Sequence, residues 1–253
     1  RSMIKSLRRV FEGLRPLAFR RVVGQADGDE LDIDAVVRWA SELHAGLEAG
    51  DRLFIRREKK ERDVAVAFLV DISGSTSRQL ESGQRVIEIE KESLVLLCES
   101  LEAVGDHYGL YAYSGQGRAY VEFLTIKDFD ERLGAATAHR LGGLDPRRQN
   151  RDGAAIRHAA AKLRTRSEKT RLLIILSDGR PLDHEYKDDY ALEDTKAALR
   201  EVKRGGIDTF CVTIDREADH YVRRMYGDTQ FAVVDRVESL PAKLPRMYQR
   251  LTR

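Results

Sequence analysis

The sequence predicts an α/β fold, a doubly wound and mostly parallel sheet that contains one antiparallel strand. Residues 64–70 form an unbroken, Val-rich apolar run that is too short for a free-standing helix. Such a run indicates a strand buried on both faces, as in a parallel sheet covered by helices. Residues 171–177 form a second strongly apolar strand. Helical segments alternate with the predicted strands, which is the order that this kind of sheet requires.

Residues 1–62 are predicted to form a helical and extended N-terminal segment that packs on the domain after it. Apolar residues at helical spacing among many Lys and Arg predict a basic amphipathic helix near residues 1–15. Asp34 is the predicted N-cap of a second helix over residues 35–49. Residues 52–57 are predicted to be an edge strand, and their charge discourages pairing with other sheets.

Residues 63–253 are predicted to form the α/β domain. A long helix over residues 85–104 carries a buried apolar stripe and ends at Gly105. Strands at 108–113 and 118–125 flank the sequence Ser-Gly-Gln-Gly and predict an antiparallel hairpin. The remaining strands are expected at 207–214 and 230–234, and the remaining helices at 130–138, 153–163, 190–204, 216–226 and 245–252, the last with Pro245 in its first turn.

Composition excludes several classes of function. The formal net charge is only +2, so the charge balance does not indicate a nucleic-acid partner. No apolar segment approaches the roughly 20 residues that cross a bilayer, and the first residues lack the apolar core of a signal peptide. Cys98 and Cys211 fall inside apolar patterns, as buried, reduced thiols do. We therefore expect a cytoplasmic protein without a membrane span, and the start at Arg1 is typical of a piece of a longer protein.

Oxygen-bearing side chains gather where the predicted strands end. Asp71, Ser73 and Ser75 follow the first apolar strand in the pattern D-x-S-x-S. The segment Asn150-Arg151-Asp152 precedes a helix, and Asp178 follows the second apolar strand. Ligands of open α/β sheets bind at the carboxyl edge of the strands. Hard oxygen ligands without His or Cys suit Mg²⁺ or Ca²⁺ better than zinc.

These three segments resemble the metal-ion-dependent adhesion site of von Willebrand factor A domains. The resemblance implies a Mg²⁺ site (or Mn²⁺ or Ca²⁺) formed by Asp71, Ser73, Ser75, Asp178 and the Asn150–Asp152 loop. It also implies an open coordination position that accepts an acidic side chain of another protein. The expected rim of the site is formed by Thr76, Arg151, Arg180 and Asp183, and we interpret the acidic residues Asp183, Asp188 and Asp189 as a solvated loop.

Longer segments are similar to a bacterial subgroup of these domains. They include RREKKERDVAVAFLVDISGST and the run from Asp178 to Asp215. The subgroup comprises NorD-type activators of nitric oxide reductase and CbbO-type activators of Rubisco, both partners of MoxR-type AAA+ ATPases. Asn150 stands where the general pattern has Thr, and Asn-x-Asp-Gly looks more like the Rubisco activators and cobaltochelatase subunits than the nitric oxide reductase group. Charge balance favours Asn150 over Asp152 as the nearer metal ligand, since a site that kept only two carboxylates would still attract an acidic partner.

The leading hypothesis is a protein-binding adaptor, not an enzyme, that grips a target enzyme for a separate AAA+ motor. The sequence has no G-x-x-x-x-G-K-[ST] motif of its own. The equivalent adaptor for nitric oxide reductase is the alternative. A Mg²⁺-dependent phosphohydrolase with Asp71 as nucleophile is a further alternative, but it needs a second carboxylate where Ser73 stands and a Lys where Arg180 is the nearest candidate. An assembly domain with an unused metal site is the third.

Overall fold

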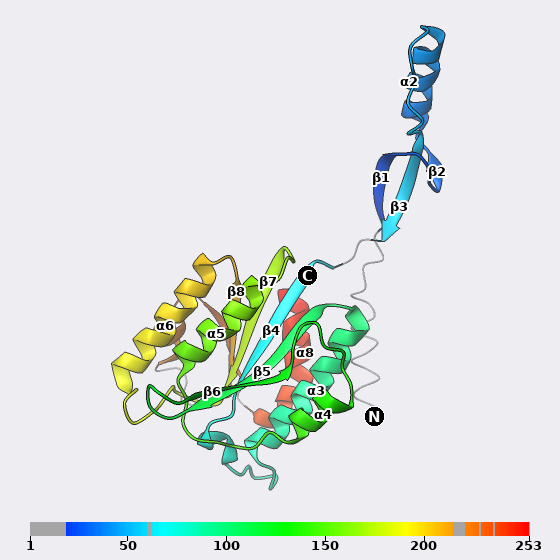
Figure 1. The fold of residues 1–253 in the computed structure, drawn as a ribbon. Helices are drawn as coiled ribbons and strands as arrows, with labels where there is room; N and C mark the ends of the chain where they lie inside the picture. Colours follow the sequence, from blue (N-terminus) through cyan, green and yellow to red (C-terminus); the bar gives the residue numbers. More distant parts are fainter. Residues whose placement is uncertain (1–18, 60–61, 215–220, 228, 235, 253) are drawn as a thin grey trace. The chain divides into compact units, whose positions relative to one another are not determined.

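The computed structural model describes residues 19–59, 62–214, 221–227, 229–234 and 236–252 (Figure 1). These residues belong to two compact units, which meet in the sequence between Arg62 and Asp63. The predicted basic helix near residues 1–15 lies outside the described residues. The expectation that the N-terminal segment packs on the following domain stays a prediction.

The smaller unit is a three-stranded antiparallel sheet with one helix. Its strands are β1 (Phe19–Gln25), β2 (Glu30–Leu31) and β3 (Phe54–Lys59), in the order β1-β3-β2. The prediction of an edge strand at 52–57 is therefore wrong, because β3 pairs on both sides. Its charges did not exclude a central position, since arginines of β3 form ion pairs within the unit, Arg56 with Asp27 and Arg57 with Glu30.

Helix α2 (Ile33–His44) begins two residues earlier than predicted. The side chain of Asp32, and not that of Asp34, accepts a hydrogen bond from the Ala35 amide. Asp34 instead lies in the first turn, where a negative charge interacts favourably with the helix dipole. The helix also ends earlier than predicted, just before Gly46, which adopts a left-handed φ of 72°.

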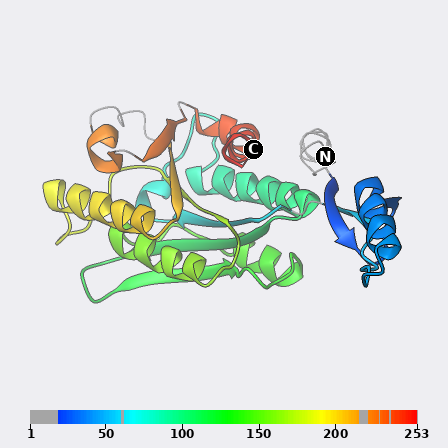
Figure 2. The same ribbon diagram turned by 90° about the horizontal axis from the view of Figure 1, so that it is seen from above.

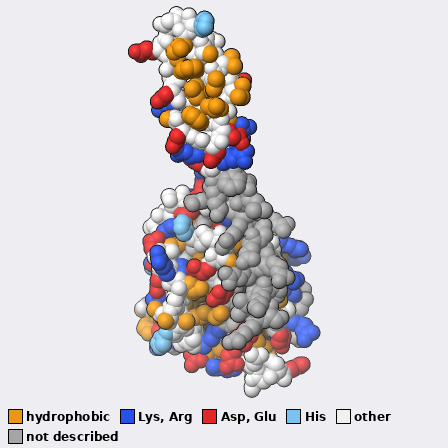
Figure 3. Space-filling model, turned by 90° about the vertical axis from the view of Figure 1, so that its right-hand side faces the viewer, with side chains coloured by type: hydrophobic (Ala, Val, Ile, Leu, Met, Phe, Trp, Pro, Cys, Tyr) orange, Lys and Arg blue, Asp and Glu red, His pale blue; other side chains and the backbone are white. Residues whose placement is uncertain are grey.

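Hydrophobic side chains gather on the surface of the smaller unit, drawn at the top of Figure 3. Exposed apolar residues come from β1, β2, α2 and the segment after α2, and they are Val23, Leu31, Ile33, Val37, Leu43 and Leu47. No helix in the described ranges is long and apolar enough to cross a membrane.

The larger unit has a six-stranded sheet in the order β6-β5-β4-β7-β8-β9. The strands are β4 (Val64–Asp71), β5 (His107–Gly115), β6 (Val121–Lys127), β7 (Thr170–Ser177), β8 (Asp208–Thr213) and β9 (Gln230–Val233). All neighbours pair in parallel except β5 and β6, which form the predicted antiparallel hairpin. The predicted fold class is confirmed, and the two most apolar strands, β4 and β7, are adjacent at its centre (Figure 1).

Helices cover both faces of this sheet (Figure 2). Alternate residues of β4 point to opposite faces. Val66, Phe68 and Val70 pack in one core with α3 (Val86–Val104) and α8 (Leu240–Leu251). Ala65, Ala67 and Leu69 pack in the other core with α5 (Asp152–Arg164), α6 (Asp188–Arg204) and α7 (Val222–Tyr226). Every residue of β4 is buried, as the unbroken apolar run predicted.

Helices α4 and α8 each start five residues away from the predicted position. Helix α4 (Ala135–Gly142) begins five residues after the predicted start at residue 130. Helix α8 begins at Leu240, with Pro241 in its first turn and Pro245 inside it. Proline suits the first turn because its missing N–H would be unpaired there anyway, so the principle was applied to the wrong proline. Both cysteines are free and buried, as predicted.

Candidate functional site

The structure brings the three predicted segments together at the carboxyl edge of the sheet. Asp71 is the last residue of β4 and is fully buried. Its Oδ1 accepts a hydrogen bond of 2.7 Å from the Ser73 amide. Its Oδ2 accepts one of 2.6 Å from Nδ2 of Asn150 in the second segment. The carboxylate therefore joins the first two segments.

A chain of hydroxyl groups joins the first segment to the third. The hydroxyls of Ser73 and Ser75 lie 3.0 Å apart, and Ser75 donates a 2.7 Å hydrogen bond to Oδ1 of Asp178. Asp178 directly follows β7 and is buried. Thr76 is also buried, and its hydroxyl donates to the Ser73 carbonyl. This hydrogen bond stabilises the segment of residues 71–77, which we call the serine loop.

Gly74 allows the first and second segments to lie against each other. A Cβ at this position would lie 3.2 Å from the Arg148 carbonyl oxygen, tighter than most such contacts. The Gly74 amide donates a 2.8 Å hydrogen bond to the same oxygen. A further bond of 2.7 Å runs from the Arg147 amide to the Ile72 carbonyl. Main-chain contacts therefore hold the serine loop in place.

Asn150 and Asp152 occupy different surroundings. Nδ2 of Asn150 donates a hydrogen bond to Asp71, and Oδ1 of Asn150 accepts a 2.7 Å hydrogen bond from the Leu182 amide. Asp152 is the first residue of α5, and its Oδ1 accepts a 2.8 Å bond from the hydroxyl of Tyr113 at the end of β5. Asn150 is thus the one in direct contact with Asp71. The preference for Asn150 as the nearer metal ligand stays a prediction.

The interpretation of Asp183 as part of a solvated loop is wrong. Its carboxylate is fully buried and accepts bonds from Nε of Arg151 (2.8 Å) and from the Gly117 amide (2.5 Å). The Arg151 guanidinium also lies over the ring of Tyr186, 4.9 Å from its centroid. This buried ion pair ties the second segment to the loop after β7. Sequence alone did not show it, because the two partners are distant along the chain.

Burial and like charges shift the acidities of the site. Burial raises the pKa of Asp71 well above its usual value, and the neighbouring Asp178 and Asp152 carboxylates raise it further. Burial also raises the pKa of Asp152 to about 7, with the Tyr113 hydrogen bond opposing the shift. Negative charge is therefore concentrated here at a cost that a bound cation would relieve.

We expect Asp152→Asn to change the pH dependence of stability when divalent cations are absent. The folded-state pKa of Asp152 lies above its unfolded value, so its stabilising contribution is complete below pH ~4 and is lost as the pH rises through about 7. Asparagine can still accept the Tyr113 hydrogen bond but cannot ionise. Urea denaturation in EDTA should therefore show a smaller loss of unfolding free energy between pH 4 and 8 in the variant, by on the order of a few kcal/mol. Identical slopes in the two proteins would contradict the assignment.

The donor set fits a hard cation that keeps several waters. Within the described residues, no group of three or more His, Cys, Asp or Glu side chains could hold a metal ion by itself. Two carboxylates and two serine hydroxyls instead form one hydrogen-bonded cluster. Asn150 turns Nδ2 toward Asp71 in this cluster, and Mg²⁺ needs few protein ligands. Hydroxyl ligands add no charge, so the ion would keep its attraction for an outside anion.

A groove of about 540 Å³ opens beside the serine loop. Its lining combines Ser73 and Ser75 with the exposed cations Arg148 and Arg180. Leu182, about half exposed, adds an apolar wall. The groove thus offers positive charge and apolar surface next to the predicted metal ligands.

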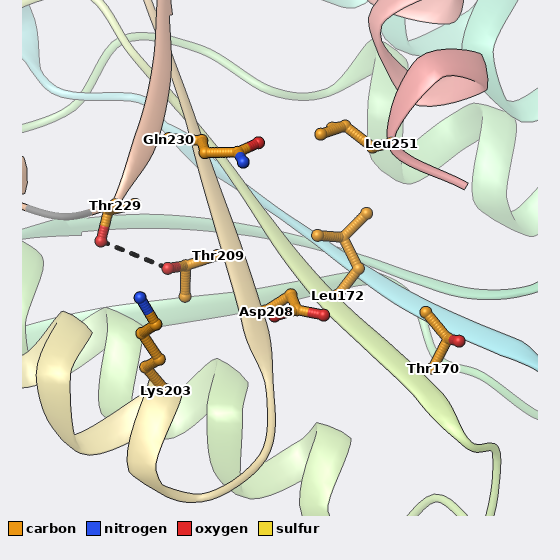
Figure 4. Close-up of a pocket in the computed structure, with 8 residues that line it drawn as sticks. All are labelled: Thr170, Leu172, Lys203, Asp208, Thr209, Thr229, Gln230 and Leu251. Carbon is orange, nitrogen blue, oxygen red and sulfur yellow. Dashed lines mark hydrogen bonds between the residues drawn. The ribbon is translucent and has the colours of Figure 1, made fainter. Parts of the chain in front are cut away.

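A second cavity has a volume of about 290 Å³, and Figure 4 shows the residues that line it. Thr170, Asp208 and Gln230, the first residues of β7, β8 and β9, line it together with Leu251 of α8. Because these strands are parallel, their first residues lie at the opposite edge of the sheet from Asp178. This cavity therefore takes no part in the candidate site.

Glu90 carries a further carboxylate near the site, which the predictions from the sequence did not include. Glu90 lies on α3, four residues after Val86 and four before Leu94, which are both core residues, and it is fully buried. The burial of Glu90 could have been predicted, because this glutamate lies within the apolar stripe of the predicted amphipathic helix. Tyr113, the partner of Asp152, was missed as well, although it falls at the carboxyl end of a predicted strand.

The geometry above agrees with a comparison to known protein families. The model of the von Willebrand factor type A domain matches residues 65–248. The chain belongs to this family. The match spans the whole six-stranded sheet and all three segments of the candidate site, and domains of this family mediate protein–protein interactions.

Bacterial relatives named NorD indicate a subgroup within this family. This von Willebrand factor type A domain is 40% identical over 253 residues to protein NorD of Brucella melitensis, covering 99% of this chain and 39% of that protein. It is 36% identical over 233 residues to protein NorD of Stutzerimonas stutzeri, covering 92% of this chain and 38% of the relative. An uncharacterized protein of Pseudomonas aeruginosa is 40% identical over 248 residues, with 98% and 40% covered. The chain spans about two fifths of the length of these curated relatives.

Solved structures share the fold at low sequence identity. The PilB minor pilin of Streptococcus sanguinis matches with a TM-score of 0.60 at 12% identity, covering 81% of this chain and 67% of the pilin. A von Willebrand factor type A protein from Catenulispora acidiphila matches with a TM-score of 0.50 at 16% identity, covering 76% of this chain and 43% of the other. These similarities support the fold alone.

Proposed function

We propose that this von Willebrand factor type A domain is a metal-dependent adaptor module of the NorD type. A Mg²⁺ ion held by Asp71, Ser73, Ser75, Asp178 and the Asn150–Asp152 loop would bind an Asp or Glu side chain of a target protein. The observation that carries the proposal is the hydrogen-bonded cluster that joins all three segments at one edge of the sheet. When bound, the ion supplies positive charge and an open coordination position.

The groove beside the serine loop supports recognition of an acidic segment. Arg148 and Arg180 add positive charge near the position where the target carboxylate would bind. Pro181 and Leu182 can contact an apolar neighbour of that carboxylate. The proposed ligand is therefore an exposed Asp or Glu next to a hydrophobic residue on the surface of the target.

The relatives named NorD favour nitric oxide reductase as the target, which was the alternative in the sequence analysis. The preference for Rubisco is not supported. That preference rested on the tetrapeptide from Asn150 to Gly153. In the structure, residues of this tetrapeptide make local packing contacts and hydrogen bonds. Asn150 bridges two loops, and Gly153 lies against Asp194 of α6. The tetrapeptide therefore reflects loop packing as much as the choice of target.

A partner ATPase completes the proposal. The similarity to the NorD subgroup supports a separate MoxR-type AAA+ motor, and the sequence contains no phosphate-binding G-x-x-x-x-G-K-[ST] motif. A phosphohydrolase is disfavoured because both oxygens of Asp71, the would-be nucleophile, accept hydrogen bonds in a fully buried position. The module would bind its target, and the motor would supply the work.

The proposal is tested by affinity capture from a native lysate in Mg²⁺ and in EDTA, with mass spectrometry of the captured proteins. We expect subunits of nitric oxide reductase to be retained in Mg²⁺ and lost in EDTA. Glu99→Ala, which removes an exposed carboxylate of α3, serves as the control and should behave as the unmodified chain does. Capture of Rubisco would reverse the choice of target. Equal capture of all partners in EDTA would refute the metal-dependent mechanism.

A further inference from the structure

Glu90 is a carboxyl group in the interior of the larger unit whose hydrogen-bonding capacity is not used within the described residues. Its side chain is fully buried in the second turn of α3. Neither carboxylate oxygen has a hydrogen-bond partner among the residues that the structure describes. A buried carboxyl group without partners destabilises a fold, and the great majority of buried polar atoms are paired. The packing of α3 alone does not explain why a carboxyl group occupies this position.

The surroundings of Glu90 relate it to the candidate metal site. The first half of α3 follows the serine loop closely in sequence, and α3 packs against the short 3₁₀ helix Gly74–Ser77 of that loop. Burial raises the pKa of Glu90 well above its usual value, and the carboxylates that raise it further are those of Asp178 and Asp71. Glu90 thus adds to the same cluster of negative charge as the two predicted metal ligands.

We propose that Glu90 is an outer carboxylate of the metal site that holds a water molecule bound to the cation. The inference rests on the proposed metal-dependent function and adds a residue that the D-x-S-x-S pattern does not contain. A hydrated cation would supply both the positive charge and the hydrogen-bond donors that the Glu90 carboxylate lacks. Mg²⁺ keeps several waters when it binds to proteins, and these waters need hydrogen-bond acceptors among the side chains around the site.

Glu90 would leave the coordination positions of the cation free. As an outer partner it would strengthen cation binding without occupying a coordination position. The open position for the target carboxylate would then remain available. Outer-shell partners of bound metals contribute about 10–100-fold to metal affinity, and we expect an effect of this size from Glu90.

The test measures Mn²⁺ affinity of the full chain, with free Mn²⁺ followed by electron paramagnetic resonance. We expect Glu90→Gln to weaken Mn²⁺ binding by about 10–100-fold. Glu99→Gln removes the same charge from an exposed position of the same helix and should bind as the unmodified chain does. Thermal melts in EDTA should show Glu90→Gln at least as stable as the unmodified chain, because the carboxyl group that the variant loses has no hydrogen-bond partner among the described residues.

An unchanged affinity in Glu90→Gln, with Glu99→Gln as reference, would overturn the inference and assign Glu90 to the packing of α3. If Glu90→Gln does not fold, Glu90→Asp gives the same comparison. It keeps the charge but is shorter, so weakened binding is expected and unchanged binding overturns the inference. Failure of the proposed function looks different, since the unmodified chain would then bind no Mn²⁺ or would bind it equally well after Asp71→Ala.

Discussion

Asp71→Ala should abolish Mg²⁺-dependent target binding while leaving the domain folded. The Asp71 carboxylate joins two of the three segments and is the predicted ligand most deeply buried in the site. We expect its loss to weaken Mg²⁺ affinity by more than about 100-fold, beyond what the loss of an outer-shell partner causes. Isothermal titration with Mg²⁺ measures the first effect, and capture of the target measures the second.

The fold should survive this change because opposing contributions partly cancel. Alanine leaves the Ser73 amide and the Asn150 side-chain amide without their acceptor, which costs about 1–3 kcal/mol for a buried group. It also removes the repulsion of Asp71 by the Asp178 and Asp152 carboxylates. Asp145→Ala, at an exposed position, provides the control. Intact Mg²⁺-dependent binding in folded Asp71→Ala would refute the adhesion-site mechanism.

Gly153→Ala should destabilise the larger unit by about 1–3 kcal/mol, as overpacking of an interior does. A Cβ on Gly153 would lie 2.0 Å from Oδ2 of Asp194 and 2.9 Å from Nη1 of Arg157. Asp194 cannot easily move away, since it accepts bonds from the buried Tyr186 hydroxyl and from Arg157. Because Gly153 follows Asp152 at the start of α5, the strain would fall on the second segment of the site.

Chemical denaturation of the variant measures this effect, and Gly142→Ala is its matched control. A Cβ on Gly142, the last residue of α4, would contact nothing within 4 Å. Alanine is the better helix former by about 1 kcal/mol, so the control should be as stable as the unmodified chain or slightly more. If Gly153→Ala were equally stable, the Asp194 side chain would be free to move and α5 would not depend on this close approach.

The fold was predictable because its signals are local. The apolar runs of β4 (seven residues) and β7 (five residues) are strands that are buried on both faces, and such runs have few alternative structures. The smaller unit was predicted less well. Strand β1 was not predicted, because it mixes Arg with Val. Strand β3 was predicted at an edge, because its pairing with β1 and β2 and the ion pairs of Arg56 and Arg57 join residues that are distant in the sequence.

The candidate site was predictable for a similar reason. Parallel strands end at a common edge, so Asp71, Asp178 and the residues before α5 had to lie near one another once the topology was known. By itself, the sequence determined the fold class, the family and the three segments of the site, because periodicity, strand ends and motif spacing are properties of the chain alone.

Only the tertiary structure decided how the side chains of the site are used. In the structure, Asn150 is hydrogen-bonded to Asp71, Asp152 to Tyr113, and the buried Asp183 to Arg151. It also placed Glu90 in the interior without a partner among the described residues. These hydrogen bonds and this burial depend on contacts between residues that are far apart in the chain and on the exclusion of water from the interior. Neither can be read from a linear sequence.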